Sequence, residues 1–343
     1  MTLLAAEASG ALSRMRGKRA LLIGDFVLDS YLYGETARIS REAPVLVVRR
    51  EREEHRAGAA ANTAANLAAL GLEVCALGWV GDDAAGRTLR DLLARAGCSA
   101  DSLEVLAGVA TPVKTRILAG AFGTGRQQVL RLDAHTERRQ LSALDARLAE
   151  LLREHARRAD VVVASDYGMG TLGPEAVRAL RALAAEGTPI CVDSRDGLRS
   201  FGGVTVVTPN VPEAEAFVGH AIDSDADVQA AGQKILRELG CAACLLTQGK
   251  HGMTLFRADG PAAHVGVVGH SDVTDVTGAG DTVIATMAAA LGAGVDWHTG
   301  MRLANCAAGV VVMRRGTAAA SPAEIVAQAS LAERPSATQR THS

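Results

Sequence analysis

The segment Asp-Val-Thr-Gly-Ala-Gly-Asp at residues 275–281 combines residues suited to bind an anion and to accept a proton. It leads into an apolar run, residues 282–291, that predicts a helix. Thr277 and the glycines would expose backbone N–H groups at the helix start, where the amides lack intrahelical partners and the helix dipole is positive. Gly278 and Gly280 also allow a ligand to approach closely and permit unusual backbone dihedrals.

Asp281 falls in the first turn of this helix, where the dipole stabilises its carboxylate as an anion. Such a carboxylate can accept a hydroxyl proton at neutral pH, next to a phosphate held by the amides. Phosphoryl transfer needs this arrangement, because its catalysis is mostly positioning and charge stabilisation. A plain capped helix after a glycine turn is the alternative, and the spacing alone does not separate the two. The chain has no Gly-x-x-x-x-Gly-Lys-Ser/Thr segment, which excludes a P-loop.

A second glycine motif follows an apolar run at residues 161–165. Residues 168–173 read Gly-Met-Gly-Thr-Leu-Gly, which imitates the fingerprint of a dinucleotide-binding site. In a true fingerprint the tight turn follows the strand directly, whereas here further residues intervene. We therefore interpret the segment as a loop at the carboxyl end of a strand, with Asp166 and Tyr167 lining a pocket. An NAD-dependent oxidoreductase stays as an alternative.

The overall composition excludes several classes of function. Lys and Arg number 36 against 38 Asp and Glu, for a net charge of −2, whereas a nucleic-acid-binding protein should carry a basic excess. No apolar run approaches the length of about 18 residues that a membrane span needs. Glu7 interrupts the apolar N-terminal stretch, and a basic cluster follows that stretch instead of preceding it, so a signal peptide is not indicated. We expect a cytoplasmic protein.

Six cysteines are dispersed along the chain. Cys241 and Cys244 form a Cys-x-x-Cys pair, but no two further ligands lie at a spacing that suits zinc. We therefore favour a structural role for these cysteines over redox or metal chemistry.

Short buried strands alternate with helical patterns along the chain, which is typical of an α/β fold with a largely parallel central sheet. The predicted strands are residues 20–24, 74–80, 161–165, 190–193, 204–209 and 243–247. The predicted helices are residues 63–70, 84–96, 142–157, 174–186 and 228–239.

Two segments, residues 31–54 and 112–133, read as extended chain without an intervening helix. We predict that they form a small antiparallel sheet that acts as a lid over the site, because insertions over sheet ends commonly carry binding function. An edge extension of the main sheet is the alternative. The chain would then be one domain over residues 1–329 with a disordered tail at 330–343. Exposed edges of the lid favour a homodimer.

Three ordered motifs resemble those of the ribokinase-like (PfkB) family of carbohydrate kinases. Residues 275–281 are similar to the family's C-terminal signature, and residues 58–66 resemble its N-terminal signature, with Ala59 where many relatives have a second glycine. Residues 210–213 look like its Asn-x-x-Glu motif. The resemblance covers roughly residues 18–326 and implies a ribokinase-like three-layer sandwich with a small β-sheet lid.

Further blocks resemble one subgroup of this family, the heptose-7-phosphate kinases of lipopolysaccharide precursor synthesis. They are residues 24–29, 31–34, 38–44, 114–116, 127–133 and 165–170. The last block accounts for the second glycine motif as a loop of the family. Some relatives fuse this kinase to a nucleotidylyltransferase domain, for which 343 residues leave no room, so the chain resembles the stand-alone form.

The resemblance implies the roles of the catalytic segment. Asp281 would be the general base that deprotonates the anomeric hydroxyl of the sugar. Gly278, Ala279 and Gly280 would form the anion hole for the transferred phosphoryl group. Asp275 and Thr277 would contribute to a site for a monovalent cation such as K⁺.

The resemblance also implies sites for ATP and Mg²⁺. Asn210 and Glu213 would act on Mg²⁺ and the nucleotide phosphates, partly through water, which suits the few carboxylates that magnesium takes from proteins. A turn and helix start after a proline is the structural alternative for this pair. The nucleotide-binding residues would be Asn210, Glu213, Thr247, Gly249, Gly252, Thr277 and Asn305.

Asp25 and Asp29 follow the first predicted strand, where carboxylates suit the hydrogen-bond donors of a sugar. The resemblance adds three further substrate-binding residues, which are Gly58, Asn62 and Asp193. A substrate phosphate also needs cations, although a lone arginine is more often only solvated. The candidate cations are Arg38, Lys114, Arg116, Arg131 and Arg195.

Together these features favour ATP-dependent phosphorylation of D-glycero-β-D-manno-heptose 7-phosphate at O1. Another sugar or nucleoside kinase of the same family is the first alternative, because the substrate end of the site separates family members and the 275–281 segment does not. A sugar-binding regulator without activity is a further alternative, against which the presence of Asp281 argues.

Overall fold

The computed structural model describes residues 2–120, 125–135, 141, 143–268 and 274–332. A central sheet of ten strands forms the body, in the order β14-β13-β12-β11-β10-β9-β1-β4-β5, with β6 paired to β4. All pairs from β12 to β5 are parallel, and β13 and β14 add an antiparallel edge. The strands are β1 (Arg19–Gly24), β4 (Glu73–Gly81), β5 (Cys98–Ser99), β6 (Leu103–Leu106), β9 (Val161–Asp166), β10 (Ile190–Ser194), β11 (Val206–Val207), β12 (Ala243–Thr247), β13 (Met253–Arg257) and β14 (Gly260–Val265).

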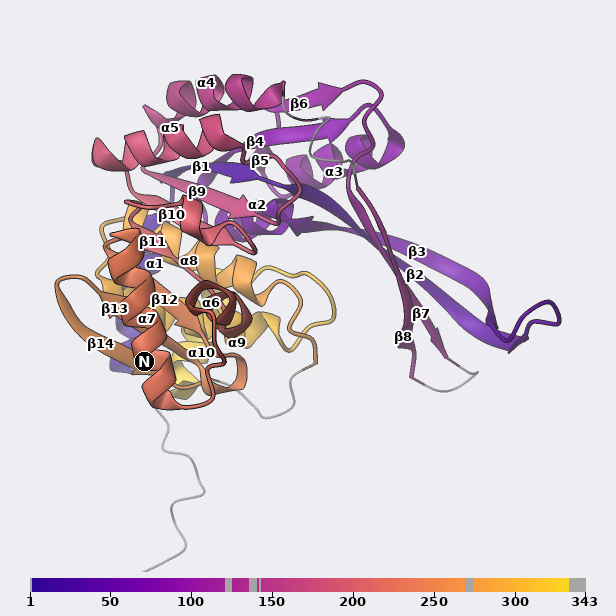
Figure 1. Cartoon of the computed structure of the whole chain (residues 1–343). Coiled ribbons are helices and arrows are strands. Elements are labelled where there is room, and N and C mark those ends of the chain that lie inside the picture. The colour runs from indigo at the N-terminus through magenta and orange to yellow at the C-terminus, as the bar shows by residue number, and fades with distance from the viewer. Residues whose placement is uncertain (1, 121–124, 136–140, 142, 269–273, 333–343) are drawn as a thin grey trace, which may run out of the picture.

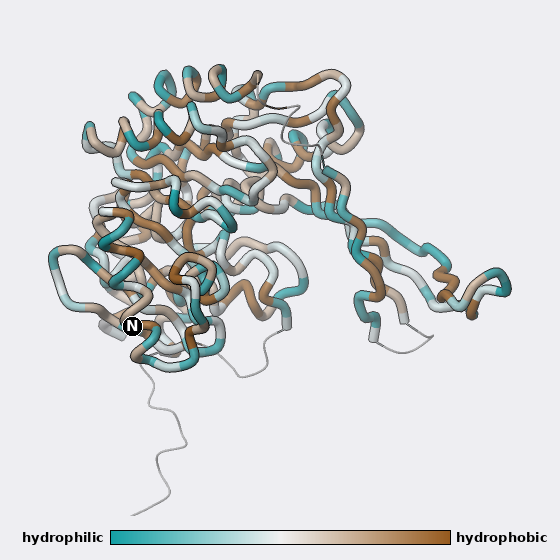
Figure 2. Tube along the Cα trace, viewed as in Figure 1, coloured by the Kyte–Doolittle hydropathy of each residue, from teal (hydrophilic) through white to brown (hydrophobic). Residues whose placement is uncertain are grey.

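Helices cover both faces of this sheet, so its central strands are continuous apolar runs buried on both sides. One face carries α1 (Leu3–Met15), α2 (Ala60–Ala69), α3 (Ala84–Arg95), α8 (Ala279–Gly292), α9 (Trp297–Val311) and α10 (Pro322–Ala332). The other face carries α4 (Leu144–Ala156), α5 (Pro174–Ala185), α6 (Val211–Val218) and α7 (Asp225–Leu239). Hydrophobic segments gather on the central strands, and hydrophilic segments on the outer helices (Figure 2). The predicted three-layer α/β fold is confirmed.

A second sheet projects from the body as a long arm (Figure 1). It contains β2 (Phe26–Ile39), β3 (Leu46–Ala59), β7 (Val113–Gly120) and β8 (Gln127–Ala134), in the order β3-β2-β7-β8. We call this four-stranded sheet the lid. The predicted separate small sheet is therefore present, and its outer pairs β2–β3 and β7–β8 are antiparallel as predicted, but its central pair is not. β2 and β7 are parallel, because both strands leave the body and run outward.

The two ends of the chain differ from the expectation in detail. Residues 3–15 form α1, a helix that the sequence interpretation did not assign. Residues 330–332 belong to the last turn of α10, whose Ile325 and Ala329 are buried in the core, so the predicted tail starts too early. Residues 333–343 lie outside the described part of the chain. No helix among the described residues is long and apolar enough to cross a membrane.

Candidate active site

The predicted site residues gather at the carboxyl ends of the parallel strands. Gly24 at the end of β1 pairs with Ser165 of β9, and Ser194 at the end of β10 pairs with Asp166. The chain segments that leave these strands therefore start side by side, as is usual for ligand sites in α/β sheets. The lid joins the body at the same edge, because β2 begins two residues after β1 ends.

Asp281 lies in the first turn of α8 and is 1% exposed. Three side-chain donors hold its carboxylate. Asn62 Nδ2 donates to Oδ2 at 2.8 Å, while Thr63 Oγ1 and Tyr167 Oη donate to Oδ1 at 3.1 and 2.9 Å. The donors come from α2 and from the loop after β9, so the packing of both against α8 fixes the orientation of the carboxylate.

Burial raises the pKa of Asp281 to about 6, against the ordinary value of 3.8. The hydrogen bonds from Asn62, Tyr167 and Thr63 act in the opposite direction, because they stabilise the charged form. At neutral pH the group is therefore mostly ionised and is a stronger base than an exposed aspartate. A pKa near the working pH is the property that suits a general base.

A buried polar network ties α2 to α8 behind the carboxylate. Asn66 Nδ2 donates to the backbone oxygen of Asn62 at 2.9 Å, and the Thr282 hydroxyl donates to Asn66 Oδ1 at 3.0 Å. The same hydroxyl lies 3.1 Å from the Gly278 carbonyl. The Asn-rich motif of the sequence thus positions Asp281, and Asn62 contacts its carboxylate directly.

Gly278 caps the N-terminus of α8 in the left-handed conformation, with φ at 80°. A Cβ atom at this position would lie 2.5 Å from Asn62 Nδ2, so both the backbone conformation and the space require glycine. Ala279 and Gly280 follow in the first turn, where the Ala279 amide donates to the Val276 carbonyl at 3.2 Å. The segment lies beside Asp281, and its role as an anion hole stays a prediction.

Asp275 stabilises the start of the segment 275–281 through hydrogen bonds. Its carboxylate accepts hydrogen bonds from the amides of Thr277 and Gly316 at 2.9 and 2.8 Å. Burial alone would raise the pKa of Asp275, but these hydrogen bonds hold it below the ordinary value. The carboxylate thus stays charged between two loops.

Asp25, which is 1% exposed, accepts three hydrogen bonds from the loop after β9. The donors are the amides of Tyr167, Met169 and Thr171, at 2.9, 3.0 and 3.1 Å. The glycine motif therefore wraps its backbone amides around a protein carboxylate, not around a dinucleotide. The contacts show that Asp25 shapes this loop, and its contact with a substrate stays a prediction.

Asp29 at the base of the lid forms a buried ion pair with Arg116, whose Nη1 lies 2.7 Å from Oδ1. The side chains are 3% and 12% exposed. Gly58 on β3 makes room for this carboxylate, because a Cβ there would lie 2.7 Å from Asp29 Cγ. The structure thus brings together three predicted substrate-binding residues.

Lys114 and Arg131 extend this charged row across the lid. Lys114 pairs in register with Asp29, and Arg131 pairs with Arg116. Lys114 is 8% exposed, and burial lowers its pKa although Asp29 acts against this. Arg131 is exposed and its Nε donates to Asp133 Oδ1 at 2.7 Å.

Arg38 does not join this cluster within one chain. It lies opposite Val47 near the outer end of the lid, roughly 30 Å further along β2 than Asp29 at the usual rise per strand residue. Its side chain is exposed. The prediction that Arg38 binds substrate therefore lacks support from the single chain, because β2 carries it away from the body.

Asn210 and Glu213 form a capping box at the start of α6. Glu213 N donates to Asn210 Oδ1, and Asn210 N donates to Glu213 Oε2, both at 2.9 Å. The pair thus caps a helix start, as the structural alternative predicts, and its role with Mg²⁺ and nucleotide stays a prediction. Burial raises the pKa of Glu213 and, together with the charges of Glu213 and Asp281, holds that of Asp193 well above its usual range.

Residues 18–324 match the pfkB family of carbohydrate kinases. The chain belongs to this family. It is 43% identical over 315 residues to the "Bifunctional protein HldE" of Methylococcus capsulatus, which covers 90% of this chain and 63% of that relative. The chain therefore spans less than two thirds of the length of this relative.

The fold is shared with distant solved kinases. The ribokinase of Arabidopsis thaliana, solved with ribose and ATP, superposes with a TM-score of 0.70 at 18% identity, over 93% of this chain and 100% of that one. Phosphofructokinase-2 of Escherichia coli gives 0.73 at 19%, over 92% and 100%. The protein is thus a carbohydrate kinase of ribokinase-like fold.

Of the predicted nucleotide-side residues, Thr247 lies next to the start of α6, and Asn305 lies on a different element. Thr247 at the end of β12 forms an isolated bridge with Asn210. Gly249 and Gly252 then turn the chain with φ at 55° and 86°. Asn305 of α9 is buried and donates from Nδ2 to the carbonyl of Gly266 at 2.7 Å.

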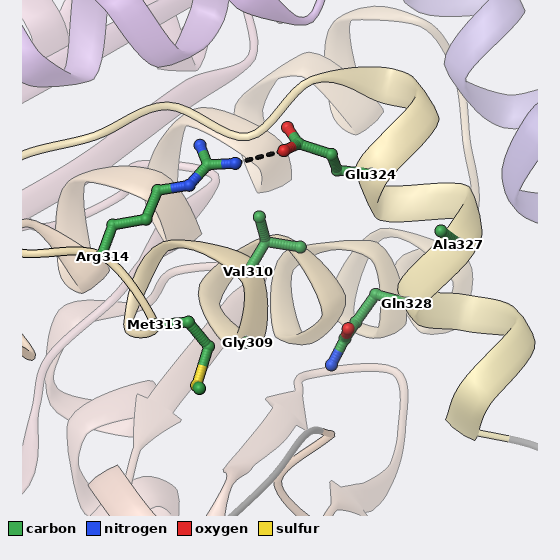
Figure 3. Close-up of a pocket in the computed structure, with 7 residues that line it drawn as sticks. All are labelled: Gly309, Val310, Met313, Arg314, Glu324, Ala327 and Gln328. Atoms are coloured by element: carbon green, nitrogen blue, oxygen red, sulfur yellow. Dashed lines mark hydrogen bonds and ion pairs between the residues drawn. The ribbon is translucent and has the colours of Figure 1, made fainter. Parts of the chain in front are cut away.

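A hollow of about 410 Å³ lies further along α9, between this helix and α10 (Figure 3). Arg314 and Glu324 pair across it. Gly309 and Gln328 line it, and Gln328 Nε2 donates to the Val268 carbonyl at 3.0 Å. The residues that line the hollow include none of those that hold Asp281, so the hollow is separate from the Asp281 carboxylate.

Two residues that contact Asp281 were not assigned this contact from the sequence. Thr63 lies next to Asn62 in the motif, so its position on the same helix end was a usable signal. Tyr167 was predicted to line a pocket, but its hydrogen bond to Asp281 joins residues 114 positions apart.

Cys241 and Cys244 are buried in the core, as a structural role requires.

Proposed function

We propose that this carbohydrate kinase transfers the γ-phosphoryl group of ATP to O1 of D-glycero-β-D-manno-heptose 7-phosphate, in the synthesis of lipopolysaccharide precursors. The observation that carries the transfer is the buried Asp281 carboxylate next to the N-terminus of α8. The choice of acceptor rests on the sequence blocks that resemble heptose-7-phosphate kinases and on the similarity to HldE.

The chain's own residues can perform the proton transfer. The sugar O1–H bond breaks as its proton passes to a carboxylate oxygen of Asp281. O1 then forms a bond to the γ-phosphorus, while the bond between this phosphorus and the bridging oxygen breaks and leaves ADP. Gly278, Ala279 and Gly280 would stabilise the charge on the phosphoryl oxygens through their amides and the helix dipole.

The row of cations on the lid supports a phosphorylated acceptor. Lys114 and Arg116 lie at the base of the lid and Arg195 follows β10 at the same edge, so positive charge surrounds the space near Tyr167. Arginine suits phosphate because its donors form a planar fork. Arg116 and Lys114 would contact the phosphate of the sugar, and Asp29 would accept from its hydroxyls.

Mg²⁺ would be held by Glu213 and Asn210, partly through water, with Asp193 nearby. Burial raises the pKa of both Glu213 and Asp193, and the charge of Glu213 adds to this at Asp193, so a divalent cation would favour their ionised forms. Oxygen donors are the ligands that this ion prefers. When bound, Mg²⁺ would neutralise charge on the nucleotide phosphates. For a monovalent cation such as K⁺, Asp275 and Thr277 are the proposed contacts.

A homodimer through the lid is part of the proposal. β8 is an edge strand on which every residue from Gln127 to Ala134 is exposed. Large exposed hydrophobic side chains lie on this edge strand and at the outer end of the β2–β3 hairpin, a combination that favours pairing with a second copy. They are Ile39, Val45, Leu46, Val129, Leu130 and Leu132. Light scattering would show a dimer, and Leu130→Lys with Leu132→Lys should give monomers.

A coupled assay of ADP release over a panel of phosphorylated heptoses, hexoses and nucleosides tests the function. We expect the highest kcat/KM with the heptose 7-phosphate and a loss of at least about 100-fold in Asp281→Asn, with ATP binding retained. A clear preference for a nucleoside or an unphosphorylated hexose would replace the acceptor but keep the kinase. No turnover with any acceptor, together with tight sugar binding, would favour a sugar-binding regulator.

A further inference from the structure

Tyr167 connects the base to the charged surface around it. Its phenol oxygen donates to Asp281 Oδ1 at 2.9 Å, and its amide donates to Asp25 at 2.9 Å. Both ends of the residue are therefore fixed, the backbone by one buried aspartate and the side chain by another. Because the amide contact holds the loop in place, the hydroxyl has a defined position relative to α8.

Two cations flank the ring of Tyr167. Lys114 Nζ lies 4.8 Å from the ring centre and Arg195 Cζ lies 5.9 Å from it. Lys114 belongs to the lid and Arg195 to the body, so the ring lies where the two parts meet. Cation–π contacts of this kind orient a ring without competing for its hydroxyl.

We propose that Tyr167 is a positioning residue for the phosphoryl transfer, whose hydroxyl holds the Asp281 carboxylate in the ionised, correctly oriented form that accepts the sugar proton. This inference rests on the proposed function, because it needs Asp281 to be the base. It gives a specific role to a residue that the sequence analysis placed only in a loop lining a pocket.

The charge distribution around Asp281 shows why a donor is needed there. Asp29 faces it from the lid and Asp193 from β10, and both carboxylates disfavour its charged form. Burial does the same. The donors that oppose these effects are Asn62 and Thr63 on α2 and Tyr167 on the loop after β9.

Tyr167→Phe keeps the ring between its two cations and removes only the hydrogen bond. We expect kcat to fall about fivefold at pH 6 and the acid limb of the kcat profile to move up by about one pH unit, since a donor to the charged form is lost. The KM for ATP should stay unchanged. A merely structural role would lower the rate equally at every pH and would not move the limb.

Tyr33→Phe is the matched control. The Tyr33 hydroxyl also donates to a carboxylate, that of Glu54 at 3.3 Å, but lies on the lid away from Asp281. Its pH profile should coincide with that of the wild type. Equal profiles for all three proteins would overturn the proposal, and so would an equal shift in both variants.

A readout without turnover is available because the chain contains only three tyrosines. With ¹³Cζ-labelled tyrosine, the NMR signal absent from Tyr167→Phe identifies Tyr167. This signal should titrate with a midpoint near pH 6, and the titration should vanish in Asp281→Asn. A signal that does not change between pH 5 and 8 would refute the contact.

The two proposals fail in different ways. If Asp281→Asn retains full turnover, the proposed base is wrong whatever Tyr167 does. If Asp281→Asn is inactive but Tyr167→Phe has an unshifted limb and the NMR signal does not titrate, only the role of Tyr167 is wrong.

Discussion

Asp281 should make the folded kinase less stable as the pH rises, and Asp281→Asn should remove this dependence. The carboxylate is buried and has a pKa of about 6 in the fold against an ordinary value of 3.8. A raised pKa means that the folded state binds the proton more tightly than the unfolded chain. The contribution is therefore fully present below about pH 4 and is lost as the pH rises through 6.

The magnitude follows from the same two values. A difference of roughly two pH units corresponds to about 3 kcal/mol in the free energy of unfolding over the whole range. Between pH 5 and 8, where the protein is convenient to study, about 1 to 1.5 kcal/mol of this is lost. Asp193 adds to the same trend, because its pKa is also raised and partly by the charge of Asp281.

Urea unfolding of the wild type and of Asp281→Asn at pH 5, 6, 7 and 8 measures this pH dependence of the free energy of unfolding. The free energy of unfolding of Asp281→Asn minus that of the wild type should increase by about 1 to 1.5 kcal/mol from pH 5 to 8. The absolute difference at one pH also contains the rearranged hydrogen bonds of Thr63 and Tyr167, so the slope is the informative quantity. Parallel curves for the two proteins would refute the assignment of a raised pKa to Asp281.

Three further substitutions test the geometry. Gly278→Ala should abolish turnover and destabilise the protein by more than about 1 kcal/mol in urea unfolding, because φ is 80° and a neighbouring amide leaves no space. Arg116→Ala should raise the KM for a phosphorylated sugar more than for its dephospho form. It should also lower the free energy of unfolding by about 3 kcal/mol, because Asp29 stays buried without its partner, whereas substitution of the exposed Arg131 by Ala should change this energy little. Equal losses of stability in the two variants would contradict the burial argument. Ala59→Gly should stabilise by about 1 kcal/mol in thermal and urea unfolding, since Ala59 adopts φ 52° and ψ −131°, and a destabilised variant would show that no strain is stored there.

The central sheet could be predicted because its signals are local. An apolar run such as 161–165 between two helical patterns specifies a buried parallel strand without reference to the rest of the chain. The orientation of the lid strands could not be obtained in this way. Whether β2 and β7 run parallel depends on where the body places their starts, and those starts are 87 residues apart in sequence.

The site shows the same division between local and distant information. Gly278 and Asp281 were predictable, because a glycine at a helix start and a carboxylate in its first turn are neighbours in sequence. The hydrogen bonds from the amides of residues 167–171 to the Asp25 carboxylate were not predictable. The glycine motif has the same sequence whether its amides bind a phosphate or a protein carboxylate. The distinction depends on which group the fold places within the loop.

The contacts of Asp281 explain why a short catalytic motif needs a whole domain. Its donors lie on α2 and on the loop after β9, 219, 218 and 114 residues away along the chain. Each donor is fixed by its own element, Asn62 by α2, which packs against α8, and Tyr167 by the buried Asp25. Because these donors oppose the effect of burial on the pKa of Asp281, the loss of any one of them from the buried site should raise that pKa. The acid limb of the rate profile is thus a sensitive measure of the packing between α2, α8 and the loop after β9.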